Sequence, residues 1–60
     1  MENEASQLVI KMNELLEKND AETAWNMQGE ITRVCNSLPL YSEEREKITE
    51  LLKKMMFKWH

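Results

Sequence analysis

The chain has 60 residues, a net charge of -3 and a composition that is 42% hydrophobic and 32% charged, with one Gly, one Pro, one Cys and one His. A chain this short forms one domain, residues 1–60, and buries only about 60% of the surface that its unfolded state exposes. The single Cys excludes an internal disulfide, and one Cys with one His is too few ligands for a zinc site. The negative net charge argues against general binding to nucleic acids, which requires Lys and Arg.

The first apolar stripe predicts a helix over about residues 3–18. Its apolar side chains recur at steps of three, one, three, three and one residues, which is helical spacing. The stripe consists of Ala5, Leu8, Val9, Met12, Leu15 and Leu16. Ile10 points almost directly away from these residues, so this helix leaves one large apolar side chain on its polar face.

Asn19 and Asp20 interrupt the stripe and predict a turn. Either side chain can accept a hydrogen bond from an amide in the first turn of the next helix, and Asn19 with Glu22 has the spacing of a capping box. A break this short turns the following helix back antiparallel to the first. The alternative is one long helix through Asn19, because neither residue forbids helical backbone.

A second helix is predicted over about residues 21–36, and it has two unequal apolar sides. The core side comprises Ala24, Met27, Ile31, Val34, Cys35 and Leu38. The other side comprises Ala21, Trp25, Gln28 and Thr32, and its polar members would need partners if buried. We expect this second side, centred on Trp25, to make a second contact with a neighbouring helix or with another chain. Gly29 either marks close approach by another helix or weakens the segment.

Pro39 ends the second helix, and the apolar residues Leu38, Leu40 and Tyr41 are expected to cover an end of the core. Ser42 then caps a third helix over about residues 43–59. Its core stripe is predicted to include Tyr41, Ile48, Leu51, Leu52, Met55, Met56 and Trp59. Phe57 lies opposite Ile48 and therefore faces away from that stripe.

These segments predict an all-α fold of three short antiparallel amphipathic helices. The third helix either folds across a hairpin formed by the first two or completes a small three-helix bundle. Because a domain of this size usually needs a disulfide, a metal or a partner for stability, and the first two are excluded or disfavoured, we expect a dimer.

No catalytic, cofactor or metal site is predicted. His60 is the last residue of the sequence and is expected to be frayed and solvated, and Cys35 lies on an apolar face where burial makes a thiol inert, with an intermolecular disulfide or redox sensing as alternatives. The Glu residues fall on polar faces, and one Gly is too few for a phosphate-binding loop. We therefore expect no enzyme activity and no cofactor.

Neither a membrane span nor a signal peptide is indicated, because no apolar run approaches about 18 residues and the first residues are acidic. The last turn mixes Lys with Met, Phe and Trp, but it is needed in the core rather than at a membrane surface. An unpaired Cys is typical of a reducing compartment. We therefore predict a cytoplasmic protein that does not bind membranes.

A surplus of apolar side chains that the monomer cannot easily bury predicts a protein-binding surface. Met and aromatic residues are enriched at the centres of such surfaces. The predicted partner-binding residues are Trp25, Phe57, Ile10, Gln28 and Trp59. We predict a small acidic protein that binds and modulates another protein as an inhibitor, anti-repressor, adaptor or assembly chaperone, and that also forms a homo-oligomer.

Two other functions fit the same pattern. The outward residues Asn26, Arg33, Asn36 and Ser37 of the second helix could form the recognition helix of a DNA-binding regulator, but Glu22 and Glu30 would meet phosphates with like charge. A structural subunit of a larger assembly is the other alternative, since it also needs only a surface.

Overall fold

The computed structural model describes residues 3–59. Met1, Glu2 and His60 lie outside the described residues, so the prediction that His60 is frayed concerns a residue that the structure does not describe. Four helices make up the described part: α1 (Glu4–Lys18), α2 (Ala21–Asn26), α3 (Gln28–Ser37) and α4 (Glu43–Lys58). Residues 3–59 contain no strand. The predicted all-α class is confirmed.

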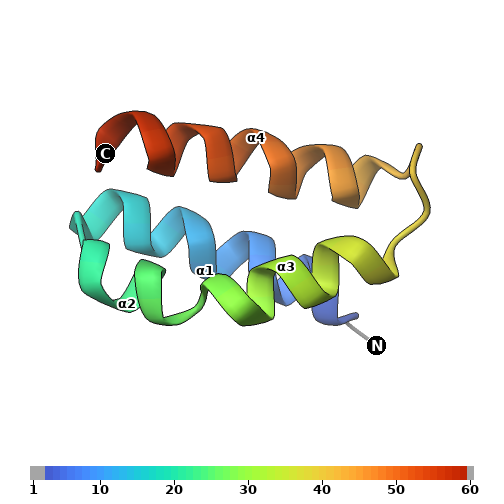
Figure 1. Ribbon diagram of the computed structural model, residues 1–60, viewed down its shortest axis with the longest axis horizontal. Coiled ribbons are helices and arrows are strands. Elements are labelled where there is room, and N and C mark those ends of the chain that lie inside the picture. Colours follow the sequence, from blue (N-terminus) through green and yellow to red (C-terminus); the bar gives the residue numbers. More distant parts are fainter. Residues whose placement is uncertain (1–2, 60) are drawn as a thin grey trace.

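The helices pack side by side along the 27 Å axis of the molecule (Figure 1). α1 and α4 run in the same direction, and α2 and α3 together run in the opposite direction. One hydrogen bond, from Trp59 Nε1 to Asn19 Oδ1 at 2.8 Å, joins the ends of α4 and α1. Another, from Arg33 Nη2 to Glu4 Oε2 at 2.7 Å, joins α3 to the start of α1.

One apolar core lies between the helices, and α4 packs most extensively on α1. Each predicted stripe contributes its central members, because these recur on the side of the helix that meets its neighbours. The buried residues are Ala5, Leu8, Met12, Leu15, Ala24, Ile31, Val34, Ile48, Leu51 and Met55. No charged or polar residue is buried in the described part of the chain.

The turn between α1 and α2 consists of two adjacent capping residues, the C-cap of α1 and the N-cap of α2. Asn19 ends α1 in the left-handed conformation, with φ 58° and ψ 40°, and the amide of Asp20 donates to the carbonyl of Leu15 at 2.9 Å. Asp20 then caps α2 by accepting hydrogen bonds from the amide and the hydroxyl of Thr23. Asn19 therefore ends the first helix and Asp20 begins the second, and the alternative of one long helix through Asn19 is wrong.

The single middle helix predicted over residues 21–36 is two helices in the structure. Met27 leaves the regular helix, with φ -90° and ψ 0°, and its amide is shared between the carbonyls of Thr23 and Ala24 at 3.0 and 3.2 Å. Asn26 and Gly29, both poor helix formers, flank the break. Ala24 and Ile31 nevertheless remain in the same core, so the break bends the element without turning the chain back.

The turn between α3 and α4 packs less than predicted. Leu38 is half-buried and its carbonyl accepts a hydrogen bond from Arg45 Nη1 at 3.0 Å, but Leu40 and Tyr41 are 72% and 97% exposed. Tyr41 is also outside the α4 stripe, because Ser42 begins the helix by capping the amide of Arg45. The expectation that Leu40 and Tyr41 cover the core is therefore wrong.

Candidate interaction surface

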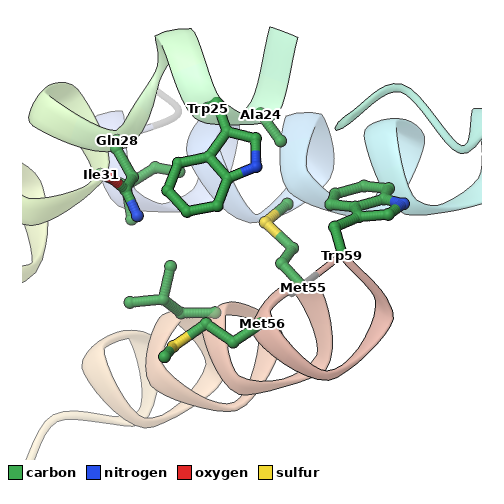
Figure 2. A pocket seen from close by; sticks show the side chains of 8 residues that line it. Ala24, Trp25, Gln28, Ile31, Met55, Met56 and Trp59 are labelled. Carbon is green, nitrogen blue, oxygen red and sulfur yellow. The ribbon is translucent and has the colours of Figure 1, made fainter. Parts of the chain in front are cut away.

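A pocket opens between α2–α3 and α4, at the side of the bundle away from α1 (Figure 2). We name it the Trp25 pocket, after the exposed tryptophan at its rim. It is lined by Ala24, Trp25, Gln28, Ile31, Leu52, Met55, Met56 and Trp59. Figure 2 shows the indole of Trp25 extending from α2 toward α4, with side chains of α4 on the facing wall.

Helix geometry explains why large apolar groups stand at this rim. Ala24 enters the core, so the next residue, Trp25, is rotated by about 100° to the helix flank that faces α4. On the opposite wall the same rotation separates the buried Met55 from Met56. Trp25 and Met56 are 54% and 59% exposed, so both keep most of their apolar surface in water.

The Trp25 pocket is free of charge in a chain that is 32% charged. Gln28 is the polar residue in the pocket lining. Its side-chain amide forms no hydrogen bond with any residue in the 3–59 range. The space between the lining residues is about 300 Å³ and includes open solvent, so the pocket is a shallow hollow rather than an enclosed cavity. A shallow apolar site of this size is suited to a side chain of another protein rather than to a cofactor.

Three of the five predicted partner-binding residues, Trp25, Gln28 and Trp59, meet at this pocket. Ile10 lies elsewhere, on the outer face of α1, where it is 53% exposed. Phe57 is on the outer side of α4 and does not line the pocket. The predicted set is therefore spread over three surfaces.

The core stripe that spacing predicts for the third helix contributes four residues to the pocket: Leu52, Met55, Met56 and Trp59. Leu52 is half-buried beside the core, but Met56 is exposed. Met56 lies where the Trp25 pocket opens to solvent, so its side chain stays exposed although it lines the same pocket as the buried Met55. The sequence signal for this surface was the second side of the middle helix, centred on Trp25.

Trp59 contributes to the fold as well as to the pocket. Its indole ring is half-buried, and its Nε1 donates to Asn19 Oδ1 across the ends of α4 and α1. The left-handed backbone of Asn19 presents its side chain toward α4 for this contact. Trp59 therefore closes one end of the Trp25 pocket and is held in place there.

Gly29 follows the Met27 break and lies four residues after Trp25. A Cβ added at this position would meet no atom within 4 Å, and its φ is not positive. Close approach by another helix of this chain is therefore not the reason for the glycine. The remaining effect within the monomer is that it weakens the start of α3.

Away from the pocket, an exposed ion pair of 2.7 Å joins Arg33 of α3 to Glu4 of α1. Arg33 donates a hydrogen bond to Glu4 and thereby lowers the pKa of that carboxyl, while Glu4 raises the pKa of Arg33. The hydroxyl and amide of Thr23 likewise lower the pKa of Asp20 through their hydrogen bonds. Arg33, the cation of the possible DNA-reading face, is thus already paired with a carboxylate.

Cys35 is half-buried, with its Sγ 4.0 Å from the Thr49 hydroxyl. Across residues 3–59, no three His, Cys, Asp or Glu side chains gather where they could hold a metal ion. None of the helices described is both long enough and apolar enough to cross a membrane.

Comparison of this chain with protein families, with curated proteins and with solved structures finds no match.

Proposed function

We propose that this chain acts by forming protein complexes rather than by catalysis. The Trp25 pocket is its contact surface, and complex formation is the means by which it modulates a partner, as an inhibitor, anti-repressor, adaptor or assembly chaperone. The predicted homodimer and the predicted cytoplasmic setting belong to the same proposal.

The observation that supports this proposal is that Trp25 and Met56 are largely exposed on either side of an uncharged pocket. Burying apolar area contributes about 25 cal/mol per Å², and a shallow pocket with a Trp at its rim provides such area with no charge to desolvate. Trp is also among the residues that contribute most to binding energy at interfaces.

The test is affinity capture from the native host with matched variants. Trp25→Ala and Ile10→Ala each remove a large side chain that is about half exposed, one at the pocket and one on the far face of α1. We expect the wild-type chain and Ile10→Ala to recover the same proteins, further copies of this chain included, and Trp25→Ala to lose them. Recovery that is equal for all three chains would contradict the proposal.

A further inference from the structure

We infer that the Trp25 pocket binds an acidic amphipathic segment of another protein, which places an apolar side chain in the pocket and its carboxylates against the lysines at the end of α4. This inference rests on the proposed function, because it names the chemistry of the partner for the same surface. The lysines are Lys53, Lys54 and Lys58, and together with Phe57 we call them the lysine patch.

The lysine patch lies on the outer face of the last turns of α4, next to the pocket. Lys53 precedes the pocket residue Met56 by three positions and Phe57 by four, so it neighbours both on the helix surface. Lys54 precedes Phe57 by three positions and lies on its other side. A ligand that extends from the pocket past Met56 therefore reaches Lys53 first and Lys54 next.

The cations of the patch are not neutralised within the described part of the chain. All three lysines are exposed, and none of their ammonium groups forms an ion pair or a hydrogen bond with any residue from 3 to 59. After Glu50, α4 contains three positive charges and no negative one. The negative end of the helix dipole, about half an elementary charge, does not offset three lysines. A carboxylate that approaches the patch therefore gains attraction without displacing an existing ion pair.

Apolar side chains on both sides of Lys53 supply the rest of the contact. Met56 and Phe57 are 59% and 86% exposed. The methylene groups of Lys53 can pack beside them while its ammonium group stays in water. An amphipathic helix with apolar residues three and four positions apart and acidic residues beside them matches this alternation of apolar and cationic groups.

The combination of pocket and lysines favours a protein segment over a nucleic acid or a membrane. Phosphate groups would pair with the lysines but would leave the Trp25 pocket, whose lining has no charged residue, without an apolar occupant. A lipid surface extends beyond the patch and would meet a chain whose acidic residues outnumber its basic ones by 11 to 8. A short segment with carboxylates and an apolar side chain contacts only the region that attracts it.

The experiment selects peptides from a random library displayed on phage, with the wild-type chain immobilised. We expect the selected peptides to combine a large apolar residue with several Asp or Glu residues. Their affinity should fall about tenfold in Trp25→Ala. It should also fall as salt rises from about 0.05 to 0.5 M, because the lysines are exposed to solvent. Selected peptides without acidic residues, or with affinities that do not respond to salt, would overturn the inference.

Charge reversal in the patch is the matched test. Lys53→Glu replaces an attraction by a repulsion and should weaken the binding of the selected peptides about tenfold. Lys47→Glu makes the same charge change at an exposed position of α4, about 15 Å along the helix from Phe57, and should have little effect. Circular dichroism checks that both variants keep the wild-type helix content. Equal weakening by the two variants would show that net charge governs binding and would overturn the inference.

Vesicles that contain phosphatidylserine and duplex DNA are the probes for the other anionic partners. We expect the wild-type chain to retain neither at about 0.15 M salt. Retention of either probe that Lys53→Glu abolishes, with no acidic peptide selected, would assign the patch to that partner and contradict a protein segment.

The outcomes separate this inference from the proposed function. Peptides that require Trp25 but bind Lys53→Glu as tightly as the wild type overturn the acidic partner and leave the proposed function intact. The proposed function fails instead when capture from the native host is the same for Trp25→Ala as for the wild type.

Discussion

The two sides of α4 differ in how completely they are covered. On one side α4 packs along α1, and the buried residues Met12 and Ile48 have no exposed surface. On the other side α2 and α3 leave the Trp25 pocket, where Leu52 is half-buried and Met56 is exposed. The tightly packed core thus lies on the α1 flank and the proposed contact surface lies on the other, so substitutions on the two flanks should affect different measurements.

The largest expected effect separates these flanks directly. Ile48→Ala removes a fully buried side chain and should destabilise the fold by about 2–5 kcal/mol, out of roughly 3–9 kcal/mol for a domain of this size. Leu52→Ala removes a half-buried one and should cost about 1 kcal/mol. Urea unfolding followed by circular dichroism measures both. Equal losses would show that the pocket flank is as tightly packed as the α1 flank.

The contact between Asn19 and Trp59 joins the two flanks at one end of the bundle. Asn19→Ala should cost about 2 kcal/mol, because Ala pays about 1 kcal/mol or more in left-handed backbone and the bond to Trp59 is lost. Asn19→Gly adopts the left-handed backbone freely and should lose only the hydrogen bond, about 1 kcal/mol. Thermal unfolding of the two variants tests this order, and a more stable Ala variant would contradict the backbone argument.

A substitution at Gly29 tests whether the glycine lowers the stability of α3, the helix on the pocket side. Gly29→Ala meets no atom and should stabilise α3 by about 0.5 kcal/mol, since Ala loses less backbone entropy than Gly on entering a helix. The measurement is the urea midpoint of Gly29→Ala compared with that of the wild type at the same protein concentration. A destabilised variant would mean that α3 is more constrained at this position than its open surroundings indicate.

The smallest effect concerns the ion pair between Arg33 and Glu4, at the end of the bundle away from Trp59. Because Arg33 lowers the pKa of Glu4 from its ordinary value of 4.5, the pair stabilises the fold above that pH and is lost as the pH falls through the lowered value. Unfolding midpoints measured between about pH 6 and pH 3 should fall less in Glu4→Gln than in the wild type. Glu14→Gln, which removes an exposed carboxylate from the same helix, is the control and should retain the wild-type dependence.

Much of the fold follows from local patterns in the sequence. The stripes of α1 and α4, the break at Asn19 and Asp20, and the Ser42 cap are set by neighbouring residues, and helical spacing and capping chemistry are sufficient to find them. The break at Met27 is different, because no Pro marks it and Gly29 is a weak signal. Met27 belongs to the same apolar stripe as Ile31, so periodicity predicts a continuous helix there.

The candidate site could be found only in part, because exposure depends on which helices meet. Spacing identified Trp25 and Gln28 at the margin of the middle helix, and these do line the pocket. The same spacing placed Met56 in the core, since a stripe does not reveal where a neighbouring helix stops covering it. Likewise, the contact of Glu4 with Arg33 joins residues 29 positions apart, which no local pattern encodes.

The most direct measurement is the change in NMR chemical shifts on dilution of the wild-type chain, because it maps the contact surface without any substitution. The division between the flanks of α4 predicts that the indole N–H of Trp25, the side-chain amide of Gln28 and the methyl group of Met56 shift with concentration, while the methyl groups of Ile10 and of the buried Ile48 do not. Shifts that are absent at every concentration, or that centre on Ile10, would contradict it.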